Sequence, residues 1–501
     1  MADYSRPRNY GAVLISLVLI FGVFVFTYAF INYGYVVGLA VTAVPLVVIV
    51  LILGIREPVW HFLLLLVVNY ILPIYMRRYP EAPIGLANDV LMALNVFAIL
   101  LTGTYKHIQW KRILNGFMLT MVIWTCYCIL ELANPRMVSF SAGLSSTRTY
   151  FVYPLVIGFI VSLSFEKFKH LFWFFNVLGA LTIASAIKAM VQKYIGFTPI
   201  EEEWVYGPGR VTHVLWSGIR YFSIFTDAGS FGSAMGIALV IFSITSLYVK
   251  NNGLRVYYWI VSLFALYGML ISGTRSSLII PIVAYVAFAF LTKNVKVSVI
   301  TAIGATAILL FLTTSNMGNG NSVIRRARSV FNTKDPSFQA RQSNQRLIRA
   351  YMANKPFGVG MGHGGGKAKA YAPDAYLSQI PTDSWFVMMW TETGIIGLII
   401  RLLLYLYVIG YGAWIVLFKL KDKRVRGITA TITVALLGTF VNLYANEILQ
   451  FPNITVFYAL HAIIFLAPYF DEELTKEASD AEAAAKSLKQ LEATVEEVEQ
   501  E

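Results

Sequence analysis

The chain has 501 residues, of which 57% are hydrophobic and 13% charged, and its formal net charge is +13. This balance excludes an ordinary water-soluble domain, in which about a quarter of the residues are charged, and it indicates a protein whose main solvent is lipid. The positive charge lies between apolar segments with no nucleic-acid-binding motif beside it, so nucleic acid is not an expected partner.

Apolar segments long enough to cross a bilayer, about 20 residues each, recur along almost the whole chain. Because lipid cannot satisfy backbone N–H and C=O groups, each segment is predicted to be a helix. The sequence therefore predicts an all-α polytopic integral membrane protein with about fourteen transmembrane helices, the first of them uncleaved, and one large helical loop outside the membrane. The expected spans are 11–31, 36–54, 59–76, 86–103, 112–133, 147–164, 170–192, 231–249, 256–271, 276–292, 296–313, 394–418, 427–446 and 453–469.

Lysine and arginine in the connecting loops orient these spans. Lysine gathers on alternate loops, which are predicted to face the cytoplasm together with both termini. The opposite loops carry arginine with few lysines. The planar guanidinium fork suits carboxylate and phosphate, so this outer face is expected to meet an anionic ligand. An anchor against lipid phosphates is the alternative for each arginine, above all for the first two. The outer arginines are Arg77, Arg78, Arg136, Arg148, Arg210, Arg220, Arg275, Arg325, Arg326, Arg328, Arg341, Arg346 and Arg349.

The loops and spans divide the chain into five segments. The stretch from 381 to 420 is too long for one straight span, so it is expected to break at Gly394 after a short helix capped by Thr382 or Asp383. The acidic tail has apolar residues at helical spacing, which predicts an amphipathic helix. The segments are an N-terminal transmembrane bundle (1–192), a second transmembrane region with the first outer loop (193–313), the large outer loop (314–393), the C-terminal transmembrane helices (394–470) and the tail (471–501).

Two short motifs place an arginine where the chain enters the membrane from outside. Arg220 precedes the turn-forming residues Asp227, Gly229 and Ser230 just before a span, where it can hold an anion at the helix N-terminus or simply anchor the span end. Arg275 lies in a Ser-Gly-Thr-Arg-Ser turn with almost no loop. A charge confined at the edge of the hydrocarbon is usually kept for a partner or a ligand, so Arg275 is predicted to be functional.

The large outer loop holds two further groups of candidates. A predicted short helix displays Arg341, Arg346 and Arg349, and a glycine-rich run with His363 follows it. The glycines allow close approach of the backbone to a ligand, but Met361 stands where a nucleotide-binding P-loop needs glycine.

The carboxylates Asp383 and Glu392 lie near the predicted membrane surface, where either could act as a base if its environment raised its pKa. The alternative for Asp383 is a helix cap. Among the histidines, His213 and His363 lie on the outer side and His363 has the better claim to chemistry. Cys126 and Cys128 point to different helix faces, so neither a disulfide nor a metal site is expected from them.

Taken in this order, the motifs resemble the membrane glycosyltransferase superfamily of O-antigen ligases and Wzy-type O-antigen polymerases. The segment from Arg220 to Asp227 is similar to that family's Arg-x-x-Gly-x-Phe-x-Asp, and the Arg275 turn to its Gly-Thr-Arg-Ser/Gly. The arginine helix with its glycine run, and Glu392-Thr-Gly-Ile-Ile-Gly, are similar to the later motifs. The matched part covers roughly 210–400. The ligases carry His-Asn where this chain has Thr382-Asp383, which makes polymerase the better expectation.

The resemblance implies a GT-C-like membrane fold in the bacterial inner membrane, with a periplasmic or extracellular active face. It implies transfer of a glycan from an undecaprenyl-diphosphate carrier to a sugar hydroxyl without a metal or other cofactor. The expected partners are the lipid-linked donor and acceptor, membrane lipids and a chain-length regulator. The implied roles are pyrophosphate stabilisation by Arg220 and Arg275, substrate binding by Arg210, Arg341, Arg346, Arg349 and Glu392, and acceptor activation by Asp383 or His363.

Three functions remain open at this point. The first is polymerisation of lipid-linked repeat units into O-antigen, capsule or exopolysaccharide. The second is ligation of finished polymer to lipid A core, for which His363 would have to replace the missing base. The third is a transporter or flippase of lipid-linked oligosaccharide, which the scarcity of charge within the spans, Arg401 being the clearest case, disfavours.

Overall fold

The computed structural model describes residues 57–79, 85–104, 108–215, 218–292, 336–364 and 371–500, with isolated positions between them. Within these residues, nine helices are long and apolar enough to cross a membrane, and Gly116–Glu131 and Arg275–Leu291 are shorter apolar helices. The prediction of an all-α polytopic membrane protein is therefore confirmed. The predicted spans 11–31, 36–54 and 296–313 lie outside the described residues, so the count of fourteen stays a prediction.

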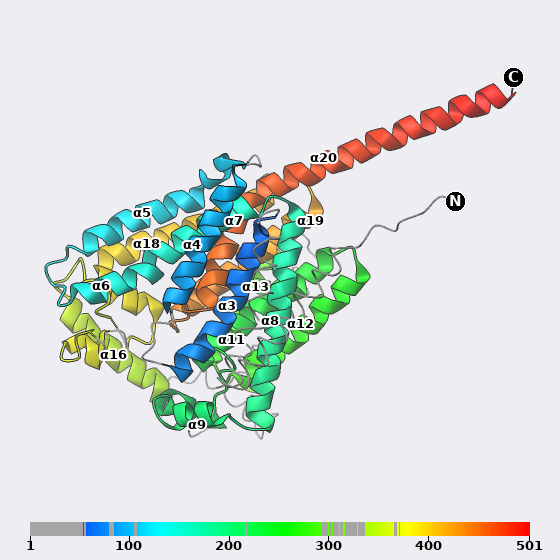
Figure 1. The fold of residues 1–501 in the computed structure, drawn as a ribbon. Helices are drawn as coiled ribbons and strands as arrows, with labels where there is room; N and C mark the ends of the chain where they lie inside the picture. The colour runs from blue at the N-terminus through cyan, green and yellow to red at the C-terminus, as the bar shows by residue number, and fades with distance from the viewer. Residues whose placement is uncertain are drawn as a thin grey trace, which may run out of the picture.

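Helices make up almost all of the described secondary structure (Figure 1). The first part of the chain forms α3 (Val59–Arg78), α4 (Gly85–Thr102), η1 (Trp110–Ile113), α5 (Gly116–Glu131), α6 (Phe140–Thr147), η2 (Arg148–Val152), α7 (Tyr153–Ser164), α8 (Phe168–Tyr194), α9 (Pro199–Tyr206) and α10 (Arg210–His213). The second part forms β1 (Val214–Leu215), β2 (Gly218–Ile219), α11 (Ala228–Thr245), η3 (Ser246–Tyr248), α12 (Asn252–Ile271), η4 (Arg275–Leu278), α13 (Ile279–Leu291), α16 (Pro336–Met352), η6 (Tyr376–Gln379), α18 (Trp385–Phe418), α19 (Lys423–Leu443) and α20 (Asn453–Gln500). The two strands pair antiparallel, with Val214 opposite Ile219.

Helices α11 and α20 form the centre of the bundle. In each, 89% of the most apolar window is buried, against 28% in α4, which has most of its surface available to lipid. Asn453 of α20 donates a hydrogen bond to the carbonyl of Ser230 in α11 at 2.9 Å, and Asn69 of α3 donates to Thr455 of α20 at 2.8 Å. Such contacts between buried polar groups tie central helices together where lipid offers no partners.

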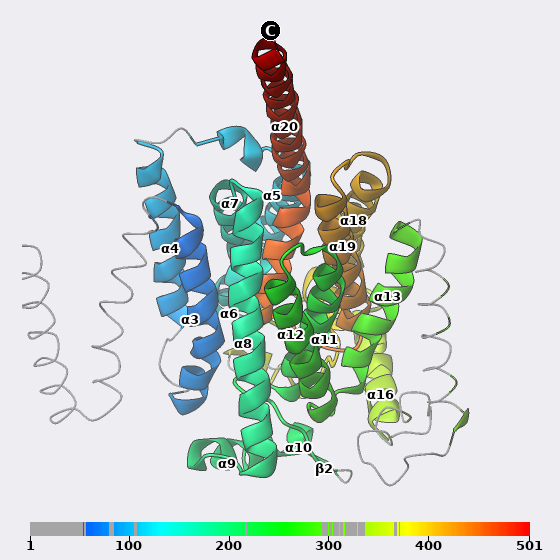
Figure 2. The same ribbon diagram turned by 90° about the vertical axis from the view of Figure 1, so that its right-hand side faces the viewer.

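The two ends of the bundle differ. Helices α9, α10 and α16 lie at one end, and the long tail of α20 leaves from the other (Figure 2). Helices α11, α13 and α18 begin at the end that carries α9, α10 and α16, and α19 ends there. All the predicted site residues belong to segments at this end.

Helix α18 contains the predicted break. Gly394 has φ of 70° and interrupts the helical backbone, which confirms the division at this residue. The predicted cap was wrong: the helix begins at Trp385, and the Ser384 side chain accepts the backbone N–H of Val387. Thr382 instead donates its hydroxyl to Glu447. The predicted helix in the tail is present and continues the last span without interruption, as Asn453–Gln500.

Candidate functional site

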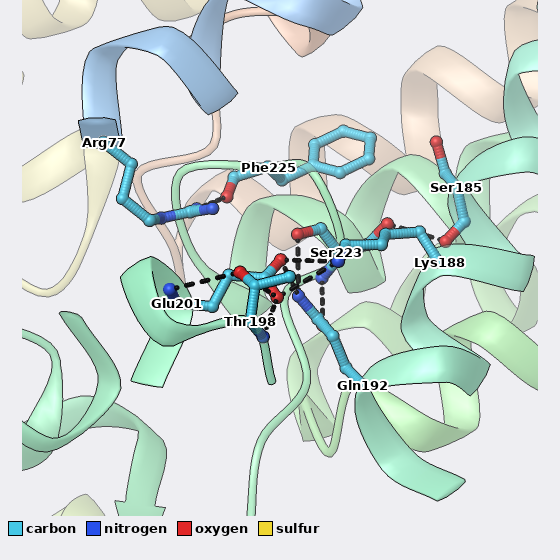
Figure 3. A network of polar contacts seen from close by, with 8 residues as sticks. All are labelled: Arg77, Ser185, Lys188, Gln192, Thr198, Glu201, Ser223 and Phe225. Atoms are coloured by element: carbon cyan, nitrogen blue, oxygen red, sulfur yellow. Dashed lines mark hydrogen bonds and ion pairs between the residues drawn. The ribbon is translucent and has the colours of Figure 1, made fainter. Parts of the chain in front are cut away.

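The loop that carries Arg220 is fixed to α8 and α9 by a polar network (Figure 3). Gln192 of α8 accepts the backbone N–H of Ser223 at 2.8 Å and donates to the Ser223 carbonyl at 3.0 Å. The Ser223 hydroxyl donates to the Ser185 carbonyl at 2.6 Å, and Ser223 itself has a left-handed φ of 56°. A strained residue persists only where its surroundings over-determine it. The network therefore pre-organises the chain around Arg220.

Glu201 is the anion of this network. Its carboxylate accepts hydrogen bonds from Gln192 at 2.9 Å, from Lys188 at 3.1 Å and from the backbone N–H of Thr198 at 2.9 Å. Burial alone would raise the pKa of Glu201, but these hydrogen bonds outweigh it and lower that pKa. Glu201 thus stays ionised and holds α9 against α8.

Arg77, expected to anchor a span end among lipid phosphates, is half-buried and contacts protein groups. Its guanidinium stacks over Phe222 and Trp204, 4.3 and 4.9 Å from the ring centroids, and donates to the Phe225 carbonyl. Arg77 therefore binds the same loop from the α3 side, and its predicted role as a lipid anchor stays a prediction. Arg78 is exposed, with its guanidinium 5.6 Å from the Tyr79 ring centroid, and its predicted anchoring role remains open.

The two arginine motifs meet at Thr274. Arg220 donates to the Thr274 hydroxyl at 2.7 Å and to the Thr212 carbonyl at 3.1 Å, and the same hydroxyl donates to the Ala228 carbonyl at 2.7 Å. Thr274 directly precedes Arg275, which is half-buried at the start of η4. The structure thus brings the Arg220 loop, the first turn of α11 and the Arg275 turn together.

The N-terminus of α11 is bound by protein groups. Asp227 caps it and accepts the Ser230 N–H at 2.9 Å, while His213 Nε2 accepts the Ala228 N–H at 3.1 Å. The predicted anion at this helix end would have to displace them. The geometry therefore favours side-chain guanidinium groups over the helix end as the binders of an anion.

Acid is expected to weaken the fold through His213. Burial, with the charge of Arg220, lowers the pKa of His213 from 6.5 to about 4. Neutral His213 therefore stabilises the folded state by at most about 3 kcal/mol. Because the unfolded chain takes up the proton first as the pH falls, this contribution is complete above about pH 6.5 and is lost as the pH falls toward 4. The thermal midpoint of the wild type should therefore drop more between about pH 7.5 and 5 than that of His213→Gln, whose amide oxygen can still accept the Ala228 N–H. Equal drops in the two proteins would contradict this role.

The loop between α19 and α20 joins the remaining candidates, and the sequence did not predict it. Asn446 donates to the Ser276 hydroxyl, next to Arg275, and to Asn442 Oδ1 at 3.1 Å. Glu447 accepts the Thr382 hydroxyl, next to Asp383. The only sequence signal was the placement of polar residues directly after a span, which many loops share. We call residues 445–447, with the side chains that contact them, the junction.

Helix α16 presents one face to the junction. Arg341 donates to the Ala445 carbonyl at 3.2 Å, and Asn344 donates to Asp383 Oδ2 at 3.3 Å. Asp383 is exposed and holds a left-handed φ of 53°, which aspartate tolerates better than most residues. Arg346 and Arg349 are exposed.

The predicted cations therefore separate into two groups. Arg220, Arg275 and Arg341 reach the junction or the turn beside it, whereas Arg346, Arg349 and, at the start of α10, Arg210 are exposed.

The glycine run packs against the break in α18. Val359 N–H donates to the Thr391 carbonyl at 2.9 Å, and Gly360 N–H to the Glu392 carbonyl at 3.1 Å. A Cβ atom on Gly358 would lie 2.4 Å from the Glu392 carbonyl oxygen. These glycines therefore let the backbone of the run approach α18 closely, where the sequence predicted close approach to a ligand.

Glu392 and His363 are also engaged by the protein. The Glu392 side chain is buried and accepts the Tyr150 hydroxyl and, at 3.0 Å, the Gly364 N–H. His363 is buried, with Nδ1 hydrogen-bonded to the Met361 carbonyl at 3.0 Å and Nε2 accepting the Ser139 N–H at 3.1 Å. A ring with both nitrogens occupied has no free position for proton transfer. The geometry favours Asp383 over His363 as the group that meets an acceptor.

No group of three or more His, Cys, Asp or Glu side chains is placed to hold a metal ion in the part of the chain that the structure describes. Cys126 is exposed and Cys128 is buried, and neither forms a disulfide.

Residues 260–402 match the family model Wzy_C, described as O-antigen ligase. This match supports the resemblance of this part of the chain to the O-antigen ligase and Wzy superfamily. The matched segment contains the Arg275 turn, α16, the glycine run and Asp383, whereas Arg220 and the junction loop lie outside it. The match supports a membrane enzyme of the general ligase or polymerase type. No curated protein matches the chain.

Proposed function

We propose that the chain polymerises undecaprenyl-diphosphate-linked oligosaccharide repeat units on the outer face of the bacterial inner membrane. The observation that carries this proposal is that the loop at 445–447 joins the turn of Arg275, to which Arg220 is bonded, with Arg341 and with the segment of the exposed Asp383. A glycosyl diphosphate leaves as an anion, and fixed guanidinium groups stabilise such charge as it develops.

The proposed step has a simple balance. The acceptor sugar hydroxyl forms a bond to the anomeric carbon of the donor, the bond from that carbon to the diphosphate breaks, and the lipid diphosphate leaves with the electron pair. Asp383 takes the hydroxyl proton. Arg220 and Arg275 hold the diphosphate, and Arg341 positions the substrate beside Asp383.

Ligation to lipid A core is the second candidate, because the matched family model is described as O-antigen ligase. Against it stands the engaged ring of His363, the residue that would have to serve as the ligase base. Purified protein supplied with two lipid-linked repeat units separates the two. Longer lipid-linked glycans support polymerisation, product formed only with a core-lipid acceptor supports ligation, and translocation without a new glycosidic bond supports a flippase.

Asp383→Asn is expected to slow elongation of lipid-linked repeats by about 10²-fold or more, since proton transfer by a positioned side chain contributes about that factor. Binding of the donor should change little, because the amide keeps the shape of the carboxylate. Asp374→Asn is the matched control, an exposed carboxylate in the same outer loop. Elongation is measured as the initial rate with purified protein. A normal rate in Asp383→Asn, or an equal loss in Asp374→Asn, would remove Asp383 from the proposed step.

A further inference from the structure

A second concave site lies at the end of the bundle opposite the junction. It is a cavity of about 180 Å³ lined by Tyr248, Leu291, Thr292, Val416, Lys423 and Arg426, together with two small residues of α19. Tyr248 follows the end of α11, Leu291 ends α13, Val416 lies near the end of α18 and Lys423 begins α19. These are the ends that point away from the junction. The distribution of lysine predicts that this end faces the cytoplasm.

The cavity carries two cations. Lys423 and Arg426 are exposed, and within the described residues neither forms an ion pair with a carboxylate. The neighbouring Arg424 differs, since it pairs with Asp422 at 3.5 Å and lies over the Phe168 ring. The positive charge at the cavity is therefore not neutralised by the helix that carries it.

The rest of the lining is mixed. Leu291 and Val416 are apolar, whereas Tyr248 and Thr292 add hydroxyl-bearing side chains. Gly427 makes the Tyr248 wall possible, because a Cβ atom there would lie 2.3 Å from the tyrosine ring. The volume is several times the roughly 30 Å³ that a water molecule takes up in the liquid. It has room for a phosphate group with the first carbons attached to it.

We propose that this cavity binds a phosphate-bearing anion. Two cations that have no carboxylate partner among the described residues attract the phosphate, and the Tyr248 hydroxyl can donate to its oxygens. The apolar walls beside them favour the headgroup of an anionic phospholipid over free phosphate. The site is separate from the Arg220 and Arg275 turns, and it stands whether or not the proposed glycan transfer is correct.

Native mass spectrometry of the purified full-length protein in detergent, titrated with phosphatidylglycerol, tests the proposal. In the double variant Lys423→Gln/Arg426→Gln, retention of phosphatidylglycerol should fall about tenfold or more, since each cation near a membrane surface contributes on the order of 1 kcal/mol. The matched control is Lys421→Gln/Arg424→Gln, which removes the same charge from the same stretch at the start of α19 but leaves the lining intact. Ala430→Leu fills the cavity without changing the charge and should also reduce retention.

Competition distinguishes the two sources of phosphate. Displacement of the lipid by millimolar inorganic phosphate, with the same dependence on Lys423 and Arg426, would identify free phosphate as the ligand. Retention that resists phosphate, and exceeds retention of phosphatidylcholine, would identify the lipid. Equal losses in the two double variants, or no loss in Ala430→Leu together with none in Lys423→Gln/Arg426→Gln, would overturn the proposal.

Discussion

Replacing Arg275 with glutamine is expected to slow glycan transfer by about 10²- to 10³-fold, the usual loss when one fixed donor to a developing anion is removed. Arg275 begins η4 beside Thr274, which fixes the position of the Arg220 guanidinium at 2.7 Å. Glutamine is polar but shorter than arginine and carries no charge, so the charge that stabilises the leaving diphosphate is removed and the loss should fall on the chemical step. The measurement is the initial rate of elongation of lipid-linked repeat units by purified protein.

Arg78→Gln is the matched control for Arg275→Gln. It removes a guanidinium from the same end of the bundle, but Arg78 is exposed at the end of α3 and is not part of the junction. Its elongation rate should stay close to that of the wild type. If Arg220 and Arg275 hold the same diphosphate, the double variant should lose less than the product of the two single losses. A normal rate in Arg275→Gln, with normal polymer length and amount in cells, would show that the diphosphate is held elsewhere.

Gly394→Ala is expected to destabilise the protein by about 3 kcal/mol or more. The residue has φ of 70°, and a Cβ atom would lie 1.9 Å from the Pro356 carbonyl oxygen. That contact joins the break in α18 to the segment leading into the glycine run, so the change separates the outer loop from the membrane helices. The thermal midpoint of the purified protein in detergent should fall by about 3 °C or more.

The control for this substitution lies on the same helix. Gly410 is exposed, and a Cβ atom there meets nothing within 4 Å. Alanine is the better helix former by about 0.5–1 kcal/mol, so Gly410→Ala should leave the midpoint unchanged or raise it slightly. A midpoint for Gly394→Ala equal to that of Gly410→Ala would mean that the break in α18 is not needed for stability.

The membrane helices were predictable because each depends on its own residues. Eleven of the predicted spans lie among the described residues, and each coincides with a helix. The break at Gly394 was predictable for the same reason, since the apolar stretch exceeded the thickness of a bilayer and glycine tolerates a left-handed backbone. The cap at Ser384 was missed by one or two residues, because Thr, Asp and Ser are all favoured cap residues and the contact of Thr382 with Glu447 depends on tertiary packing.

The candidate site was predictable only in part. Arg275 stood out because a charge confined between two spans is costly, and Asp383 because a carboxylate near the outer surface is suited to proton transfer. His363 drew attention by its place among arginines, yet its ring is taken up by Ser139 and Met361. The direction of a side chain, and hence its partners, cannot be read from residue type.

Composition, charge sorting and motif order alone predict a membrane-embedded all-α chain and a resemblance to the O-antigen ligase and Wzy superfamily. The membrane helices can be predicted in this way because the hydrophobicity of each segment alone decides whether it enters the lipid. Packing between distant helices decided which arginines meet and that Asn446 and Glu447 join them. The contact between Asn446 and Ser276 links residues 170 positions apart, and the same kind of packing places the Arg77 guanidinium over the rings of Trp204 and Phe222. Contacts of that separation depend on the complementary shapes of whole helices, which no local pattern encodes.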